Sequence, residues 1–284
     1  MHKYDIVIPV SYKDCWFLRK NIPYIRKNLI DAQTIYVVTS PRCFGELSND
    51  FCEIHNVKLL DENALWSGLT FADIKDELMS YQRADMTGWY FQQFLKLAFA
   101  LTDYAREYYL VWDADTIPLN KISFFDKDAL LVNPKKECHE AYFRTIRHLF
   151  GLEKEVNYSF IAEHMILRVD VVKEILNKLG DSWWQTILQK ADVASERQCF
   201  SEFETIGTYS SYYYPDLYKT RNLSTLRCGG MLFGRHVTAR ELYLLAMDFD
   251  TASFERAQYP ISLSRALFAK MHRVFIELKY RLPV

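Results

Sequence analysis

The sequence lacks a strong charge of either sign. Its 35 Lys and Arg residues nearly balance its 36 Asp and Glu residues, which leaves a formal net charge of -1. A balanced chain has no overall field that would draw it toward nucleic acid. We therefore expect no nucleic-acid partner, and any interaction driven by charge must come from a local patch.

The sequence also lacks metal-type cysteine spacing and long apolar runs. Its six cysteines are scattered without a CxxC pair, which argues against a zinc site or a dithiol redox motif. No apolar run approaches the roughly 18 residues of a membrane span. The first residues, MHKYDIVIPV, do not have the charged start and long apolar core of a signal peptide. These absences predict a cytoplasmic protein with reduced thiols.

What the sequence does contain is a globular composition rich in aromatic residues. Its residues are 50% hydrophobic and 25% charged, as in ordinary folded domains. The 19 Tyr, 19 Phe and 6 Trp side chains suit a packed core, and they also suit the faces of sugar rings or bases. The length allows one large α/β domain or two small ones.

Strand and helix patterns alternate from the start of the chain. Apolar, β-branched runs at 4–10, 34–40 and 56–62 predict buried parallel strands. A helix at 87–105 precedes a central strand at 107–112. This order predicts an α/β fold with a mixed, mainly parallel sheet flanked by helices. Further expected elements are helices at 139–150, 170–179, 182–191, 199–213 and 262–280, an extended segment at 159–168, and a Gly-rich turn into a strand at 227–234.

The central strand, YYLVW, ends in two carboxylates, Asp113 and Asp115. Side chains alternate along an extended chain, so both carboxylates project to one side. Like charges so close repel unless a cation lies between them or one stays protonated. Mg²⁺ and Mn²⁺ favour one or two carboxylates plus substrate phosphates, and open α/β sheets bind ligands at the carboxyl ends of their strands. The motif therefore predicts a metal–diphosphate site; the alternative is a plain turn, which Asp also favours.

Two classes of enzyme place Asp-x-Asp after a buried strand. In haloacid-dehalogenase-like phosphatases the first Asp, here Asp113, is the nucleophile, and DADT fits that motif locally. That motif normally follows the first strand of its domain, whereas three candidate strands precede it here. The companion motif GDxxxD is also missing, because Gly180-Asp181 is followed by SWWQ. Nucleotide-sugar glycosyltransferases of the GT-A fold place the motif after a nucleotide-binding β/α half, as here.

Longer segments favour the second class. DIVIPV, TGWYFQQFLKLAFA, YYLVWDADTIPL, SFIAEHMIL, FSEFETIGTY and YYPDLY together resemble a family of bacterial glycosyltransferase-like proteins that occur with capsule and lipopolysaccharide assembly functions. The resemblance covers residues 1–235. It implies a GT-A (Rossmann-like) fold, a DxD site for Mn²⁺ or Mg²⁺, and a nucleotide-sugar donor, with a UDP-sugar as the default.

The domain organisation follows from this resemblance. We expect a GT-A glycosyltransferase domain at 1–235, with a nucleotide-binding half at about 1–115 and an acceptor half at about 116–235. Residues 236–284 are expected to form a C-terminal helical extension.

The helix before the central strand carries a polar stripe. Trp89, Gln92, Gln93 and Lys96 are spaced three and four residues apart and so share one face. Polar groups on a buried helix need partners. We expect Lys96 to meet Asp113 or a donor phosphate, and Gln92 and Gln93 to bind hydroxyls of the donor or acceptor. The alternative is a structural Lys–Asp pair with core amides.

The segment SEFE supplies candidate catalytic carboxylates. Ser201 and Glu204 match the capping box S-x-x-E, which leaves Glu202 freer. An inverting sugar transfer needs a carboxylate that deprotonates the acceptor hydroxyl. We predict Glu202 as this base, with Glu204 as the alternative and Glu163 as a further candidate.

Two histidines are candidate metal ligands. GT-A enzymes often complete the metal sphere or the acceptor site with a His late in the chain, so the resemblance points to His164 and His236. The alternative is structural, because a buried His more often belongs to the core.

Two other segments are candidates for contacting the donor. Arg227 precedes a pair of glycines, and glycines let the backbone approach a ligand closely while Arg binds phosphate; a plain turn with a solvated Arg is the alternative. Pro9, Val10 and Ser11 follow the first strand, where a GT-A fold receives the base and ribose.

The last expected helix combines apolar and basic side chains. Leu267, Met271, Val274 and Leu278 form an apolar stripe. The basic residues are Arg265, Lys270, Arg273, Lys279 and Arg281. Such a helix predicts either packing on the domain or peripheral association with an anionic membrane surface.

Together these features predict a metal-dependent, inverting glycosyltransferase of surface polysaccharide biosynthesis. Its expected acceptor is a glycan or a lipid-linked oligosaccharide, and its expected location is the cytoplasm or the inner face of the membrane. The alternatives are a phosphatase with Asp113 as nucleophile and a nucleotide-sugar or glycan-binding protein without turnover.

Overall fold

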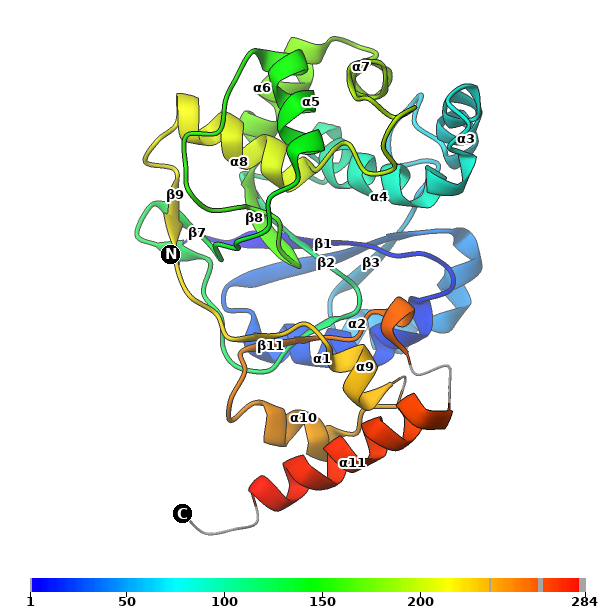
Figure 1. Ribbon diagram of the computed structural model, residues 1–284, viewed down its shortest axis with the longest axis vertical. Coiled ribbons are helices and arrows are strands. Elements are labelled where there is room, and N and C mark those ends of the chain that lie inside the picture. Colours follow the sequence, from blue (N-terminus) through cyan, green and yellow to red (C-terminus); the bar gives the residue numbers. More distant parts are fainter. Residues whose placement is uncertain (1, 235, 260–262, 281–284) are drawn as a thin grey trace. The chain divides into compact units, whose positions relative to one another are not determined.

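The computed structural model describes residues 2–234, 236–259 and 263–280, and the chain divides into two compact units (Figure 1). The first unit comprises Met1–Tyr12, Asp31–Trp112 and Phe124–Arg221. The second unit comprises Lys13–Ile30, Asp113–Ser123 and Asn222–Val284. Each unit is therefore assembled from segments that are far apart in the sequence.

The first unit is built on a five-stranded sheet with the order β3-β2-β1-β4-β8. β1 (Tyr4–Pro9), β2 (Ala32–Thr39), β3 (Val57–Asp61) and β4 (Tyr108–Trp112) are parallel, and β8 (His164–Arg168) pairs antiparallel with β4. β1 and β4 are buried along their whole length, which is why both are continuous apolar runs rather than alternating ones. The predicted mixed, mainly parallel sheet is confirmed.

Helices flank this sheet, and α8 packs against α4, α5 and α6 (Figure 1). They are α2 (Asn49–Ile54), α3 (Phe71–Ser80), α4 (Thr87–Ala98), α5 (Glu140–Phe150), α6 (Val169–Leu179), α7 (Trp183–Lys190) and α8 (Glu202–Tyr213). A small second sheet contains β6 (Phe125–Asp126), β7 (Ala129–Val132) and β9 (Tyr218–Thr220). Short 3-10 turns lie at Pro41–Glu46, Ala84–Met86 and Phe99–Leu101 in this unit, and at Cys15–Phe17 and Arg256–Gln258 in the second.

In its described residues, the second unit joins a three-stranded sheet to four α-helices. The strands are β5 (Thr116–Pro118), β10 (Thr225–Leu226) and β11 (Thr251–Ser253), in the order β10-β11-β5. The helices are α1 (Leu18–Asn28), α9 (Gly229–Phe233), α10 (Ala239–Leu245) and α11 (Leu263–Lys279). Buried residues of six of these segments belong to one apolar cluster: Ile117, Leu226, Ala252, Phe233, Leu242 and Ile276. Tyr24 of α1 packs against the same cluster, so all of these segments contribute to a common core.

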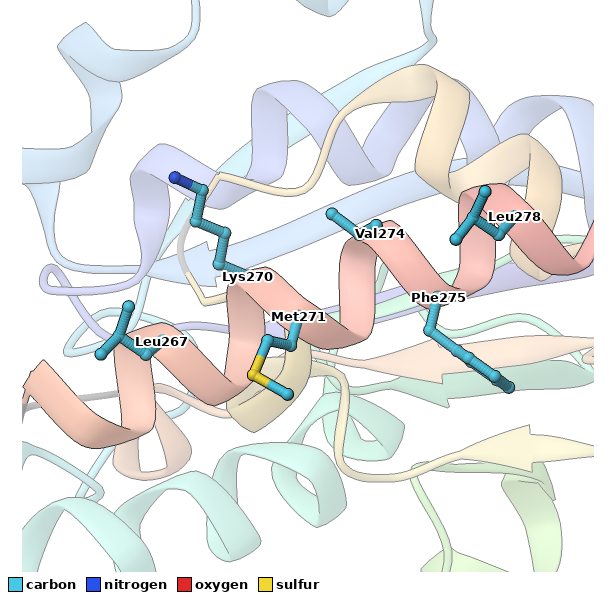
Figure 2. Close-up of a pocket in the computed structure, with 6 residues that line it drawn as sticks. All are labelled: Leu267, Lys270, Met271, Val274, Phe275 and Leu278. Carbon is cyan, nitrogen blue, oxygen red and sulfur yellow. The ribbon is translucent and has the colours of Figure 1, made fainter.

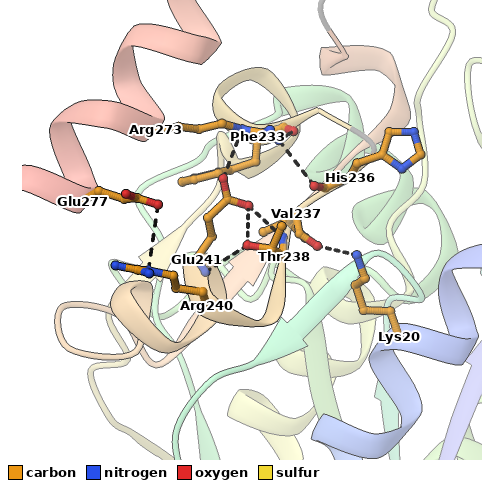
Figure 3. Close-up of polar contacts among 9 residues, drawn as sticks. All are labelled: Lys20, Phe233, His236, Val237, Thr238, Arg240, Glu241, Arg273 and Glu277. Atoms are coloured by element: carbon orange, nitrogen blue, oxygen red, sulfur yellow. Dashed lines mark hydrogen bonds and ion pairs between the residues drawn. The ribbon is translucent and has the colours of Figure 1, made fainter.

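Polar contacts fasten α11 to the rest of the second unit (Figure 3). The Arg273 guanidinium lies 3.2 Å from the Glu241 carboxylate and donates to the Phe233 carbonyl. Glu241 also completes a capping box with Thr238 at the start of α10. Glu277 and Arg240 form a looser pair at 3.8 Å. One side of α11 is therefore committed to its own unit.

Three elements differ from expectation. α4 stops at Ala98 instead of 105, because the Thr102 hydroxyl and backbone NH both donate to the Phe99 carbonyl and close a tighter turn. Within residues 227–234, Gly229–Phe233 form α9 where a turn into a strand was expected. β8 begins only at His164, because the chain before it is held by side-chain contacts described below rather than by a strand partner on β4.

Four of the six cysteines, Cys52, Cys138, Cys199 and Cys228, are free thiols. The expectation of reduced thiols agrees with the structure at these four positions.

Gly207 marks a close contact between α8 and the ring of Phe160 in the first unit. A methyl group at this position of α8 would overlap the ring of Phe160. We expect Gly207→Ala to lower the free energy of unfolding by about 1–3 kcal/mol or more, because the ring has to move within a packed core. Gly88→Ala is the matched control: its Cβ on α4 meets nothing within 4 Å, so it should stabilise by up to about 1 kcal/mol. Urea denaturation of both variants checks this, and equal effects would contradict it.

Candidate functional site

The Asp-x-Asp motif directly follows β4. Asp113 and Asp115 are partly exposed, while Ala114 between them is buried. The motif forms a turn rather than an extended segment, because the Thr116 backbone NH donates to the Asp113 carbonyl at 3.1 Å. The expectation that both carboxylates project to one side assumed an extended chain, so it stays a prediction. Both belong to the second unit, whose own residues fix their backbone.

Neighbouring segments of the second unit hold the motif on both sides. The buried Asn21 amide of α1 donates to the Ala114 carbonyl at 2.8 Å. The Phe254 backbone NH, just after β11, donates to the Asp115 carbonyl at 2.9 Å. The Thr116 hydroxyl lies 2.8 Å from the Ser253 hydroxyl. With its backbone held in this way, the motif keeps its two carboxylates in place at little further entropic cost.

Negative charge is concentrated around Asp115. Burial raises the pKa of Asp115 to about 7, and the carboxylates of Asp113, Glu255 and Asp14 raise it further in that order of size. Asp14 also lies 3.6 Å from the Arg256 guanidinium. A buried carboxylate among other carboxylates is stabilised by a bound cation. The donor set thus fits a hard divalent cation such as Mg²⁺ or Mn²⁺.

The protein part of such a metal site would be small. Among the described residues, no group of three or more His, Cys, Asp or Glu side chains is arranged to hold a metal ion. Mg²⁺ commonly uses one or two carboxylates and takes its remaining ligands from water and substrate phosphates. Asp113 and Asp115 are therefore sufficient only together with a phosphate-bearing ligand.

The glycines after Arg227 serve packing within the second unit. A Cβ on Gly229 would lie 2.5 Å from the Ser253 carbonyl oxygen, and one on Gly230 would lie 2.5 Å from that of Glu255. They let α9 approach the chain after β11, which carries Glu255 toward Asp115. The Arg227 side chain is exposed, and its carbonyl accepts a hydrogen bond from Gln258 at 3.1 Å.

His236 is exposed, and its imidazole points away from the polar network around Arg273 (Figure 3). Its carbonyl accepts a long hydrogen bond of 3.5 Å from Arg273. The backbone of His236 therefore takes part in the contacts with Arg273, whereas its ring faces solvent.

In the first unit, Glu202 lies in a buried polar cluster. Its carboxylate is 2.8 Å from the Lys96 ammonium, and both side chains are at most 5% exposed. The Gln93 amide nitrogen donates to Glu202 Oε1 at 2.9 Å in the orientation that satisfies both groups. The stripe on α4 thus has the partners that its burial requires. We call Lys96, Gln93 and Glu202 the Lys96 cluster.

Glu204 is fully buried two residues further along α8. Its backbone NH donates to the Ser201 hydroxyl at 3.2 Å, which is one half of the expected capping box. Its carboxylate does not return that bond; it accepts from Ser159, from the Phe160 backbone and from Lys154, at 2.7, 3.0 and 2.9 Å. Glu204 therefore pins the chain that leads into β8.

His164 and Glu163 lie at the start of β8, beside the end of β4. His164 is 3% exposed and stacks on Trp112, with ring centroids 4.7 Å apart. Burial lowers its pKa well below the usual value, and Arg221 and Lys135 lower it further, so the ring is neutral. Glu163 is 5% exposed and lies 3.3 Å from Lys135. A neutral imidazole retains the lone pair that a metal or an acceptor hydroxyl requires.

The end of β1 meets α4. Pro9 and Val10 are buried and Ser11 is exposed. The Gln92 amide donates to the Pro9 carbonyl at 3.4 Å, and the Thr39 hydroxyl donates to the Val10 carbonyl at 2.7 Å. The carboxyl ends of β1 and β2 and the polar face of α4 are thus brought together.

Sequence reasoning missed Asp14, Glu255 and Asn21 near the motif, and Lys135 beside Glu163. None of these residues lies in a pattern that marks a site locally. Asp14 and Glu255 come from opposite ends of the chain, and only the assembly of the second unit brings their charges to Asp115.

Comparison with known proteins shows to which family the chain belongs. A family model matches residues 9–223. The chain belongs to DUF6492, a family of unknown function. Comparison with curated proteins gives no match.

Some solved structures are similar in outline. Mouse xyloside xylosyltransferase 1, in its apo form, is 11% identical with a TM-score of 0.48, covering 92% of this chain and 100% of its own. The galactosyltransferase LgtC, in complex with donor and acceptor sugar analogs, is 12% identical with a TM-score of 0.48, covering 96% and 95%. The apo glycosyltransferase GlyE of Streptococcus pneumoniae is 12% identical with a TM-score of 0.43, covering 99% and 63%. Such low identities and scores assign no function to this chain.

Proposed function

We propose that the protein is a metal-dependent glycosyltransferase of the GT-A type. The observation that carries the proposal is the carboxylate site at Asp115, whose pKa is raised to about 7 by burial and by Asp113, Glu255 and Asp14. The site follows the strand next to β1 in a β3-β2-β1-β4 order, the edge where doubly wound sheets bind nucleotides. A divalent cation bound here would offset the negative charge of the carboxylates, and a nucleoside diphosphate would supply further oxygen ligands to that cation.

In this proposal Asp115 and Asp113 hold Mn²⁺ or Mg²⁺ at the donor diphosphate. The bound cation would offset the charge of the leaving nucleoside diphosphate. Pro9, Val10, Ser11 and Gln92 are proposed to receive the nucleoside, and Arg227 the diphosphate. His164 and His236 are proposed to contact the acceptor rather than the metal, because no described group of three or more His, Cys, Asp or Glu side chains is arranged to hold a metal ion.

Glu202 is the proposed base for the acceptor hydroxyl. The neighbouring ammonium of Lys96 favours the ionised carboxylate, which is the form that accepts a proton. Direct attack with such a base implies inversion at the anomeric carbon; a retaining enzyme needs no base at this position. Glu204 and Glu163 are the alternatives. The proposed donor is a UDP-sugar, and the acceptor is a glycan or lipid-linked oligosaccharide of bacterial capsule or lipopolysaccharide.

A thermal-shift screen tests the proposal. The purified protein is mixed with UDP-, GDP-, CMP- and dTDP-sugars, with and without Mn²⁺. We expect one nucleotide class to raise the melting temperature only with metal. Phosphate release from phosphate esters without any nucleotide-sugar effect would instead favour the phosphatase with Asp113 as nucleophile. Donor binding without hydrolysis or transfer would favour a binding protein.

We further propose that α11 attaches the enzyme to the inner face of the membrane, where a lipid-linked acceptor is presented. Six apolar side chains on α11 are each more than half exposed: Leu267, Phe268, Met271, Val274, Phe275 and Leu278. Figure 2 shows all of them except Phe268. We call these six residues the α11 stripe. Its spacing of three and four residues supports a helix that lies in the interface. No helix in the described part of the chain is long and apolar enough to cross a membrane.

The basic side chains of α11 contribute less than their number suggests. Arg273 is paired with Glu241, and Lys279 lies 2.5 Å from Asp248. Lys270 borders the stripe and is exposed (Figure 2). Arg281 and the side chain of Arg265 lie outside the described residues. Binding should therefore depend mainly on the apolar side chains.

Vesicle flotation of the full chain checks this attachment. We expect the double variant Met271→Asp, Phe275→Asp to reduce binding to phosphatidylglycerol-containing vesicles at least about tenfold, because each apolar side chain contributes about 1.5–3 kcal/mol on burial. Binding of the unaltered chain should persist at 0.5 M salt, which screens charge but not apolar insertion. Ile54→Asp is the matched control, since Ile54 is 76% exposed in the first unit. Equal flotation of all three proteins would contradict the attachment.

A further inference from the structure

The first unit contains a small pocket away from the proposed catalytic carboxylates. It has a volume of about 210 Å³ and lies where the chain before β8, the end of α8 and the start of β9 meet. We call it the tyrosine pocket, because Tyr158, Tyr214 and Tyr218 line it. Glu155 and Ser211 also belong to the lining. Ser211 lies roughly 14 Å along α8 from Glu202 by helix rise, so the pocket is distinct from the Lys96 cluster.

Two of the tyrosine rings are held rigidly. The Tyr214 hydroxyl donates to Glu174, and the Arg168 guanidinium lies 4.8 Å from the centre of the Tyr214 ring. The Tyr218 hydroxyl donates to the Ile166 carbonyl at 3.0 Å. Aromatic walls fixed in this way bind a ligand without the entropic cost of ordering them.

The polar groups of the pocket match a polyhydroxylated ligand. Burial raises the pKa of Tyr158, so its hydroxyl keeps its proton; within the described chain this hydroxyl makes no hydrogen bond and is a donor for a ligand. Ser211 gives its proton to the Gly207 carbonyl at 2.8 Å, which leaves its oxygen as an acceptor. The exposed Glu155 carboxylate accepts from one or two hydroxyls. The set therefore offers one donor, several acceptors and aromatic faces.

The size and charge of the pocket limit the kinds of ligand that it can bind. A volume of about 210 Å³ is below the roughly 300–1,000 Å³ of pockets for drug-sized ligands, so one ring fits and a nucleoside diphosphate does not. Glu155 in the lining, and Glu174 behind Tyr214, disfavour an anionic ligand. A neutral pyranose satisfies each of these conditions, because its hydroxyls meet the polar groups while its ring lies on tyrosine.

We propose that the tyrosine pocket binds one neutral pyranose ring of a glycan. Identifying this glycan as the acceptor rests on the proposed function, whereas the binding itself does not. Given the separation along α8, an acceptor that fills the pocket and reaches Glu202 is an oligosaccharide rather than a single sugar.

Saturation-transfer NMR on the full chain tests the pocket directly. The probes are the methyl β-glycosides of glucose, galactose and N-acetylglucosamine, with glucuronate as the anionic control. We expect saturation transfer to at least one neutral glycoside and none to glucuronate. Tyr158→Phe and Glu155→Gln should weaken binding of that glycoside about five- to tenfold, because each removes one hydrogen-bonding function. Tyr243→Phe is the matched control, since Tyr243 is 67% exposed in the second unit.

The outcomes separate this proposal from the transferase proposal. Three results would contradict sugar binding in the tyrosine pocket. They are no saturation transfer to any neutral glycoside, saturation transfer to glucuronate that equals that to the neutral glycosides, and equal affinities of all variants for the glycoside. Nucleotide release from UDP-sugars with Mn²⁺ and water alone is measured in parallel and should be unchanged in the pocket variants. Sugar binding without any such turnover would count against the transferase and leave the pocket standing.

Discussion

Replacing Asp115 with Asn is expected to abolish metal-dependent donor binding and to lower sugar transfer at least about 100- to 1,000-fold. The amide keeps the size of the side chain but removes the negative charge that a divalent cation requires. Removing it also relieves the repulsion from Asp113, Glu255 and Asp14, so the variant should fold well. Calorimetric titration with Mn²⁺ and UDP, followed by nucleotide-release kinetics, measures both effects.

The raised pKa of Asp115 adds a pH dependence. The pKa rises from an ordinary 3.8 to about 7 in the folded protein, so the folded state binds this proton more tightly than the unfolded chain does. The resulting stability is present at low pH and is lost as the pH rises through about 7. A cation needs the deprotonated form. The Mn²⁺-induced rise in melting temperature should therefore grow between pH 6 and pH 8.

The Asp115→Asn variant tests whether deprotonated Asp115 causes this pH dependence. At pH 8 and without metal it should melt at a higher temperature than the unaltered protein, and Mn²⁺ should give it no pH-dependent shift. Asp103→Asn is the control, because Asp103 is exposed in the first unit, away from the motif. A Mn²⁺ effect that survives in the Asp115 variant would rule out Asp115 as the metal ligand.

The sheet was predictable from the sequence for a definite physical reason. β1 and β4 are buried on both faces, and a strand buried in this way has to be a continuous apolar run. The position of Asp113 and Asp115 after β4 follows from the same run, because it ends where the charges begin. A local sequence pattern is therefore enough to predict an element when that one segment alone produces the pattern.

Long-range contacts were not predictable in the same way. The pair of glycines at 229 and 230 is typical of a turn, yet they lie in α9. They are glycines because the backbone of Ser253 and Glu255 leaves no room for a Cβ. The stripe on α4 correctly indicated that Lys96 needs a buried partner. That the structure pairs it with Glu202 depends on how α4 packs against α8, which spacing within one helix does not encode.

Because of this pairing, a substitution of Glu202 is expected to have a large effect on both stability and sugar transfer. Glu202→Gln is expected to lower the free energy of unfolding by about 3–5 kcal/mol, because it removes the carboxylate that faces a buried ammonium. If Glu202 is also the base, transfer falls by a further factor of about 10²–10⁴. Urea denaturation and transfer kinetics measure the two effects separately. Asp126→Asn is the matched control, because its exposed pair with Lys219, at 2.9 Å, should contribute little to stability.

The double variant Lys96→Met, Glu202→Gln separates structure from chemistry. Removing both charges leaves no uncompensated ammonium, so much of the lost stability should return. A base cannot be replaced by restored packing, so transfer should remain as low as in Glu202→Gln alone. Recovery of transfer together with stability would show that Glu202 only holds α8 to α4. The search for the base would then turn to Glu163, because Glu204 is fully buried and already bonded to Lys154, Ser159 and Phe160.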